Sequence, residues 1–302
     1  MYAHTSPRMI ALTGLLCLAL LAPAAHADTV KRTFDVASGG TLEVDTDQGS
    51  VHITTAPGSQ VRITVLREAR SGDDEDFELR FDQRGNDVIV EGERPGSGWS
   101  WNKRFKIRFD IVVPEQYDLE IETAGGSISV ADLQGDVNCH TSGGSIDVDD
   151  IEGRVDCRTS GGSIDIGRVD GTVMAKTSGG SISIDRSGGS VVAKTSGGNI
   201  TVNEVLGSID ATTSGGSVRA TISSQPQADC RLSTSGGKVD VQLADSVAVD
   251  LDARTSGGRV HVDVPVMVQG TVGRSSLQGE VNGGGPQLHL RTSGGSIHVR
   301  RR

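Results

Sequence analysis

The chain has 302 residues, 41 of them Gly, with 3% aromatic residues and a formal net charge of -10. Gly does not recur at every third position, which excludes a collagen-like chain, and Gly costs about 1 kcal/mol per helix position relative to Ala, which argues against a helical protein. Phosphate binding needs a concentrated basic surface, so the acidic balance of the chain disfavours nucleic acid as a partner.

Residues 1–27 are typical of a secretory signal peptide. Arg8 precedes an apolar stretch, residues 9–22, that is too short for an ordinary transmembrane span. Ala25-His26-Ala27 fits the small-x-small cleavage rule, so we expect cleavage near Ala27 and a mature chain from Asp28. No later segment is long and apolar enough to be a transmembrane segment. We therefore predict a periplasmic, secreted or cell-surface protein.

Residues 28–118 predict early β-strands, because apolar and polar residues alternate in several short runs. The runs lie at residues 42–45, 51–54, 61–65, 88–90 and 106–111, and residues 71–76 and 95–98 predict turns. Every aromatic residue of the expected mature chain lies between Phe34 and Tyr117. The segment therefore predicts an aromatic-packed β cap on the following repeats, not an independent domain.

Residues 119–302 contain a repeat built on Thr-Ser-Gly-Gly. The series starts with Thr-Ala-Gly-Gly at Thr123, and further copies start at Thr141, Thr159, Thr177, Thr195, Thr213, Thr234, Thr255 and Thr292. The first six starts are 18 residues apart, the next two steps are 21, and the last gap of 37 suggests a degenerate copy around residues 275–281. A fixed period of this length is the signature of stacked structural repeats.

Each repeat predicts two short strands joined at Gly-bearing corners, where Gly can adopt positive φ without steric cost. One such unit cannot bury its apolar face alone, whereas stacked units can. We therefore predict an all-β, single-chain parallel β-solenoid (β-helix) of roughly ten coils. Inward positions hold Ile146 and Ile164, and the position two before each Thr holds small residues such as Ala175. The core is therefore expected to be thin.

The three cysteines of the expected mature chain are Cys139, Cys157 and Cys230. The repeat register places Cys139 directly beside Cys157 on the next coil, within the Cα separation that a disulfide requires. A disulfide and two packed thiols both fit this placement. Cys230 lies in another register and is expected to stay free.

A stretch from Lys106 to Ile128 (KIRFDIVVPEQYDLEIETAGGSI), followed by Thr-Ser-Gly-Gly-Ser-Ile copies, resembles a bacterial β-strand-repeat family labelled "putative adhesin", a domain of unknown function. The segment from Leu42 to Ile53 is similar to that family's opening, so the resemblance covers nearly all of residues 34–302. It implies a β-solenoid of the bacterial cell envelope, with related domains in some envelope-stress systems. The family brings no catalytic residues to carry over.

A basic register directly precedes the repeated Thr. It contains His140 and a possible surface-binding ladder made of Arg158, Lys176, Lys194, Arg254 and Arg291. Such a ladder could contact an acidic glycan or another envelope protein, and the alternative is outward charge that only keeps the chain soluble. The chain ends in Arg300, Arg301 and Arg302, which we expect to blunt exposed strand edges at the end of the solenoid.

The sequence gives less support to metal binding and to catalysis. Calcium-binding β-rolls need a third Gly where this repeat has Ile146, so we predict no metal site and no cofactor. Asp147 and Asp165 share one outward register and are the pair on which a polysaccharide-active enzyme of the parallel β-helix type would depend. His261 and His298 occupy that register too.

We therefore expect an exported, non-enzymatic β-solenoid that acts as an adhesin-like interaction or stress-related module of the envelope. The alternatives are the polysaccharide-active enzyme and a passive structural spacer. The ligand and the oligomeric state stay open.

Overall fold

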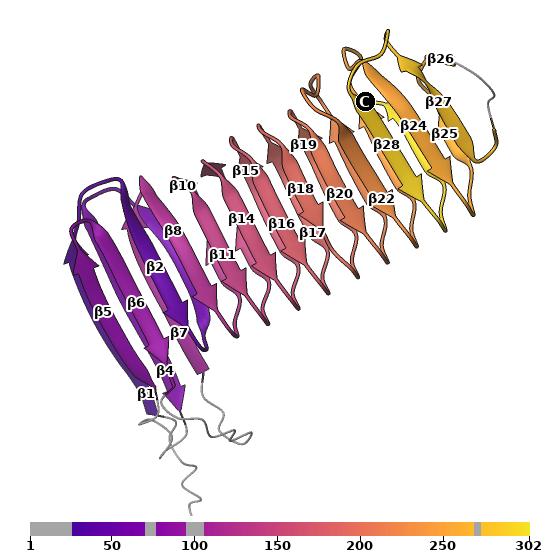
Figure 1. Ribbon diagram of the computed structural model, residues 1–302. Coiled ribbons are helices and arrows are strands. Elements are labelled where there is room, and N and C mark those ends of the chain that lie inside the picture. Colours follow the sequence, from indigo (N-terminus) through magenta and orange to yellow (C-terminus); the bar gives the residue numbers. More distant parts are fainter. Residues whose placement is uncertain (1–25, 70–76, 95–105, 269–272) are drawn as a thin grey trace, which may run out of the picture.

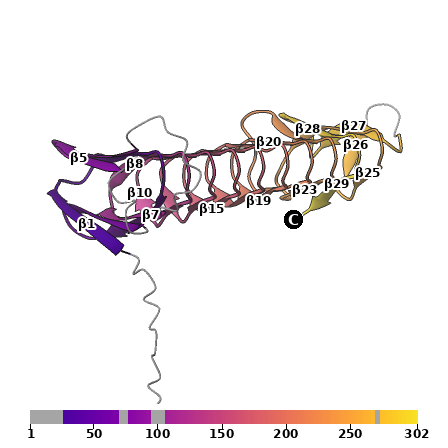
Figure 2. The same cartoon turned by 90° about the horizontal axis from the view of Figure 1, so that it is seen from below.

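The computed structural model of the protein describes residues 26–69, 77–94, 106–268 and 273–302. The predicted signal peptide, except for its last two residues, and the predicted turns at 71–76 and 95–98 lie outside these ranges. The described residues form two long sheets that face each other in a flattened rod (Figures 1 and 2). They include no helix that is long and apolar enough to span a membrane. The predicted all-β solenoid is thereby confirmed.

The first sheet, sheet A, follows one side of the rod. From the N-terminal end its strands are β1 (His26–Asp35), β4 (Gln60–Ala69), β7 (Lys106–Pro114), β3 (Ser50–Ala56), β9 (Ile128–Val130), β12 (Ile146–Val148), β15 (Ile164–Val169), β17 (Ile182–Ser187), β19 (Ile200–Val205), β21 (Val218–Ile222), β23 (Val239–Leu243), β29 (Ile297–Arg301) and β25 (Val260–Val262), with the short strands β10 (Leu133–Gln134) and β13 (Ile151–Glu152) beside this path.

The second sheet, sheet B, forms the opposite side. From the same end its strands are β5 (Glu78–Arg84), β6 (Asp87–Glu93), β2 (Gly40–Thr46), β8 (Tyr117–Thr123), β11 (Val137–Thr141), β14 (Val155–Thr159), β16 (Val173–Thr177), β18 (Val191–Lys194), β20 (Ile209–Thr213), β22 (Cys230–Thr234), β28 (Gln287–Thr292), β24 (Val249–Thr255), β27 (Ser276–Val281) and β26 (Val266–Val268).

One coil consists of a strand of sheet B, a Thr-Ser-Gly-Gly corner and a strand of sheet A. The repeated Thr is buried, and its hydroxyl joins two coils. Thr159 Oγ1 donates to the carbonyl oxygen of Gly144 at 2.8 Å and accepts from the backbone N–H of Gly162 at 3.3 Å. The same pair of bonds recurs at Thr141.

The reason for Gly at the corner differs from the prediction. Gly126 has positive φ, but Gly144 and Gly162 do not. Instead, adjacent backbones touch there: a Cβ on Gly144 would lie 2.0 Å from the carbonyl oxygen of Gly126, and one on Gly162 would lie 2.2 Å from that of Gly144. Close coil stacking therefore excludes any side chain at this position.

The core is the thin aliphatic layer that the alternation predicts. Ile146 and Ile164 are fully buried, as are the small residues two positions before each Thr, including Ala175 and Ala193. Large aromatic side chains are buried only near the N-terminal end, where Phe109 and Tyr117 lie under the cap strands.

The N-terminal end begins with coils whose spatial order differs from their order in the sequence. β2 and β3 form a coil that pairs with β8 and β9 on one side and with β6 and β7 on the other, all in parallel. The division into a cap, 28–118, and a solenoid, 119–302, stays a prediction, since both sheets continue through it.

The C-terminal end shows the same arrangement and corrects two expectations. β28 and β29 lie between the β22–β23 coil and the β24–β25 coil (Figures 1 and 2), so the chain does not end at the end of the rod. The predicted degenerate copy at 275–281 is instead the antiparallel strand β27, which covers β24. An irregular sequence lacking the Thr-Ser-Gly-Gly corner does not continue the coil.

The three C-terminal arginines accordingly do not cover a solenoid end. Arg300 pairs with the buried Asp240, Arg301 with Asp245, and Arg302 Nη1 lies 2.9 Å from a carboxylate oxygen of Glu204. They attach the inserted last coil to earlier coils along the side of the rod.

Candidate functional site

The predicted basic register follows the outer face of sheet B. His140, Arg158, Lys176 and Lys194 are register partners on four successive strands. Thr212 and Ser233 then interrupt the series, followed by Arg291 and, beyond it, Arg254. The five Arg and Lys residues thus form two groups. In the second group Arg291 comes before Arg254 along the rod, the reverse of their order in the sequence, because β28 lies between β22 and β24 in the sheet. We call Arg158, Lys176 and Lys194 the basic strip.

Acidic residues in the neighbouring register partly neutralise these cations. Arg158 Nη2 lies 2.8 Å from Asp156, and Lys194 Nζ lies 3.0 Å from Asp210. Lys176 has no ion pair within the described residues, and its neighbours in that register are Met174 and Val192. The sequence signal for the first pair is an Asp two residues before the basic position. Lys194 has Val192 there and pairs instead with Asp210, the register partner of Val192 on the next coil.

The same face is acidic nearer the N-terminal end. Glu43 and Glu120 are register partners, as are Asp45 and Glu122, and Glu122 is next to His140. Burial raises the pKa of Asp45, and the carboxylates of Glu122, Asp47, Glu91 and Glu93 raise it further. The outer face of sheet B is therefore divided into an acidic end and the basic strip.

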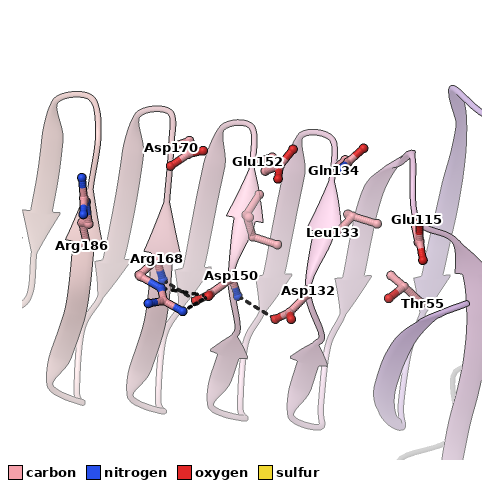
Figure 3. A pocket seen from close by; sticks show the side chains of 11 residues that line it. Thr55, Glu115, Asp132, Leu133, Gln134, Asp150, Glu152, Arg168, Asp170 and Arg186 are labelled. Atoms are coloured by element: carbon pink, nitrogen blue, oxygen red, sulfur yellow. Dashed lines mark hydrogen bonds and ion pairs between the residues drawn. The ribbon is translucent and has the colours of Figure 1, made fainter.

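A groove of about 670 Å³ lies at the corner where the chain returns from sheet A to sheet B (Figure 3). We call it the corner groove; sequence reasoning did not identify it. Arg168 Nη2 lies 2.6 Å from Asp150, whose backbone N–H donates to Asp132 at 3.2 Å. Hydrogen bonds from Arg168 hold the pKa of Asp150 below its ordinary value. Asp150 is thus kept ionised and is unsuited to act as a general acid.

The carboxylates of the enzyme hypothesis do lie together. Asp147 and Asp165 are register partners on β12 and β15, with their side chains on the exposed face of sheet A. Burial raises the pKa of Asp165, and the Asp147 carboxylate adds to this effect. Neither residue lines the corner groove. The pair therefore faces open surface.

The predicted histidine register also holds. The rings of His261 and His298 lie with their centroids 4.9 Å apart on β25 and β29. Across the ranges that the structure describes, no group of three or more His, Cys, Asp and Glu side chains is arranged to hold a metal ion.

Cys139 and Cys157 are register partners on β11 and β14, and both are fully buried. They are thiols in this structure, as is Cys230. Contact with the Cys139 thiol and burial raise the pKa of Cys157. The disulfide itself stays a prediction.

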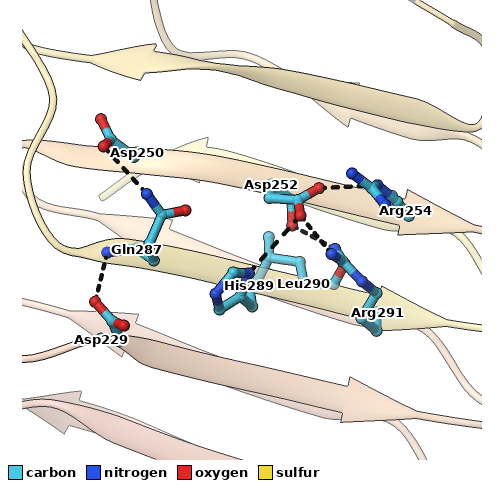
Figure 4. A network of polar contacts seen from close by, with 8 residues as sticks. All are labelled: Asp229, Asp250, Asp252, Arg254, Gln287, His289, Leu290 and Arg291. Atoms are coloured by element: carbon cyan, nitrogen blue, oxygen red, sulfur yellow. Dashed lines mark hydrogen bonds and ion pairs between the residues drawn. The ribbon is translucent and has the colours of Figure 1, made fainter.

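The second group of cations, Arg254 and Arg291, surrounds a buried carboxylate (Figure 4). Asp252 is 9% exposed, pairs with Arg291, and lies 3.1 Å from Arg254 Nε. Burial acts to raise the pKa of Asp252, but both arginines and Gln278 outweigh it, so the pKa is lowered. Asp252 thus stays charged and holds both guanidinium groups in place.

The comparison with protein families decides where this chain belongs. A family model described as Toastrack DUF4097 matches residues 40–300. The chain belongs to the Toastrack DUF4097 family. That match confirms the resemblance to a putative adhesin family that the repeat indicated, and it includes the whole basic register. No curated protein matches the sequence of this Toastrack chain.

Several solved structures are similar to this Toastrack chain at low identity. A "putative adhesin" from Bacteroides fragilis has 9% identity over 91% of this chain and 97% of its own, with a TM-score of 0.37. A "putative lipid binding protein" from Parabacteroides distasonis has 7% identity over 92% and 98%, with a TM-score of 0.35. A "putative cell adhesion protein" from Clostridium sporogenes has 12% identity over 91% and 100%, with a TM-score of 0.22.

Proposed function

We propose that this Toastrack chain is an exported, non-enzymatic module of the bacterial envelope that binds an acidic glycan along the outer face of sheet B. The basic strip is the contact surface. The observation that carries the proposal is the placement of Arg158, Lys176 and Lys194 at one register on successive parallel strands.

The regular spacing of the strip suits a polymer. Adjacent strands repeat at about 4.8 Å, so the three cations form a straight row of evenly spaced charges. A chain of like units can make the same contact at each step, which favours binding through several weak contacts. Lys176, without an ion pair in the described residues, is the least neutralised cation of the row.

Several observations support a binding role over catalysis. Asp147 and Asp165 face open surface, and Asp150 in the corner groove is committed to Arg168. A glycosidase needs one carboxyl group that is protonated near neutral pH and one that is ionised, beside a bound sugar. Open, uniform coils do not hold a sugar ring between two such groups.

Export is part of the same proposal. The sequence of residues 1–27 supports it, because a basic residue, a short apolar stretch and a small-x-small site follow in order. We place the mature protein in the periplasm or at the cell surface, where acidic glycans are available.

The test applies the exported form of the chain to arrays of acidic and neutral glycans. The same protein is then incubated with uronate glycans, and new reducing or unsaturated ends are measured. We expect retention on acidic glycans and no new ends. New ends would establish the enzyme instead, and no retention on any glycan would contradict the proposal. Capture of one envelope protein in place of a glycan would also contradict it.

A further inference from the structure

A second basic site lies on the same face, beyond the strip. A hollow of about 420 Å³ is lined by Arg254, Arg291 and the serines Ser256, Ser275, Ser276 and Ser293, together with corner threonines. None of the residues that line it is acidic. We call it the Arg254 pocket. Three strand steps separate Lys194 from Arg291, about 14 Å, so the pocket is distinct from the basic strip.

The strand β27 creates the pocket. It runs antiparallel to β24 and places Ser276 beside Arg254. The carbonyl oxygen of Ser275 accepts a hydrogen bond from the backbone N–H of Thr255 at 2.9 Å, which fixes this serine pair against the corner. A further parallel coil would not bring these two hydroxyls to this position.

The guanidinium groups at the pocket are held in place. Arg291 Nη1 donates to the backbone oxygens of Asp252 at 2.7 Å and Leu290 at 3.0 Å, and Nη2 contacts the Asp252 carboxylate. The guanidinium group of Arg254 approaches Asp252 only through Nε, and within the described part of the chain this group donates no hydrogen bond of standard geometry. Its remaining donors are available to a ligand.

The charge of the site favours an anion. Two guanidinium groups face a single carboxylate, that of Asp252, and this leaves one positive charge at a hollow lined otherwise by hydroxyls. Guanidinium donors and serine hydroxyls are the groups that bind the oxygens of a phosphate, because its oxygens accept several charge-assisted hydrogen bonds at once.

We propose that the Arg254 pocket binds a phosphate group, either inorganic phosphate or a phosphate ester on a sugar. The inference deepens the proposed function and rests on it for the source of the ligand, because it names a second chemical group that an envelope glycan would present. Arg254 supplies the free donors, Asp252 and Arg291 position them, and the serines complete the contact.

The experiment titrates the full chain with inorganic phosphate, glucose 6-phosphate and glucuronate by calorimetry at low ionic strength. The variant is Arg254→Gln. The matched control is Arg231→Gln, which removes the same charge from an exposed residue on the same face that does not line the pocket. We expect R254Q to weaken phosphate binding at least about tenfold and R231Q to leave it unchanged. A second variant, Ser293→Ala, should weaken binding without changing the charge.

The outcomes are separable. Tighter binding of glucose 6-phosphate than of phosphate identifies a phosphorylated sugar as the source, and equal binding identifies free phosphate. No phosphate binding by the unmodified chain, equal binding of glucuronate, or equal losses in R254Q and R231Q would overturn the inference. Reversing the charges of the basic strip leaves the Arg254 pocket intact. A variant with these reversals that still binds phosphate would therefore support the pocket even if the proposed glycan binding fails.

Discussion

The repeated Thr and the second Gly of each corner have separate structural roles. The Thr hydroxyl connects its own corner to the preceding coil, and the Gly permits the two backbones to meet. At the Thr141 corner the first Gly has more space, since a Cβ on Gly143 would lie 3.8 Å from its nearest neighbour, whereas one on Gly179 would lie 2.9 Å from the carbonyl oxygen of Gly161. The two glycines of the Thr141 corner look alike in the sequence but therefore differ in what they tolerate.

This difference is testable with one pair of variants. Gly144→Ala places a Cβ 2.0 Å from the carbonyl oxygen of Gly126, which cannot shift without moving the backbone of its coil. We therefore expect this substitution to lower the free energy of unfolding by about 1–3 kcal/mol. Gly143→Ala is the control and should change it by less than about 0.5 kcal/mol. Urea unfolding measures both. Equal losses would show that stacking contact is not the reason for Gly at this position.

The Thr hydroxyl is tested by Thr177→Val, which keeps the side-chain shape. Thr177 Oγ1 donates to the Gly162 oxygen at 2.8 Å, and its loss leaves a buried acceptor unsatisfied, at a cost of about 1–3 kcal/mol. The exposed Thr172→Val should have little effect. Thermal and urea unfolding of the two variants give the comparison, and a T177V protein as stable as T172V would refute the role.

The stacked carboxylates of sheet A predict a pH dependence. Because burial and the Asp147 charge raise the pKa of Asp165 in the folded chain, its ionised form opposes folding above that pKa. We expect Asp165→Asn to raise the melting temperature at pH 7 and to lose this gain as the pH falls below about 4, where both states are protonated. Asp156→Asn, which removes an ion pair with Arg158, should give no gain at pH 7. A pH-independent effect of D165N would contradict this reasoning.

At the scale of the strand, the inserted terminal coils are the main departure from a simple stack. β2–β3 and β28–β29 each lie one coil inside the rod end, where both neighbours pair with them. Chain termini usually fray because one side lacks partners, and the insertion of β28–β29 removes that cause at the C-terminal end. The end positions are held instead by antiparallel strands such as β1 at one end and β26 and β27 at the other.

Hydrogen exchange provides a direct check on this insertion. The amides of Ile297 and Val299 should exchange as slowly as those of Val239 and Val241 in the preceding coil, although they lie near the chain terminus. The reason is that β29 has hydrogen-bonded neighbours on both sides, β23 and β25. Exchange of β29 at the rate of a frayed end would show that the last coil is not inserted.

The sequence predicts the coil but not the order of the coils. Alternation around Ile146 and Ile164 and the spacing of Thr141 and Thr159 are local, so the strands, the inward positions and the parallel register follow from them. The order of the coils along the rod depends on which corner stacks on which, and the corners are nearly identical in sequence. The corner at Thr292 fits equally well beside those at Thr234 and Thr255, and nothing local selects between them.

The candidate site was predictable in the same partial way. The register of Arg158, Lys176 and Lys194 follows from the repeat, whereas their ion pairs depend on the neighbouring register, which holds Asp156 and Asp210. The Arg254 pocket could not be predicted, because it requires β27 to turn back beside β24 in place of a further coil.

At the scale of the whole molecule, the rod carries its charges in blocks along one face. The acidic end, the basic strip and the Arg254 pocket follow one another along sheet B, while the chain as a whole has a net charge of -10. The affinity for an anionic polymer should therefore depend on where the positive charges lie on the surface and not only on the net charge of the chain. This is the central claim of the proposed function.

The measurement that tests it most directly compares two triple charge reversals by their affinity for a soluble polyuronate. One carries Arg158→Glu, Lys176→Glu and Lys194→Glu. The other carries Lys31→Glu, Arg62→Glu and Arg219→Glu, which make the same change in net charge on the exposed face of sheet A.

We expect the unmodified chain to bind with an affinity that falls as salt rises, the sheet B variant to lose at least about tenfold, and the sheet A variant to keep nearly all of it. Equal affinity of the two variants would contradict the account.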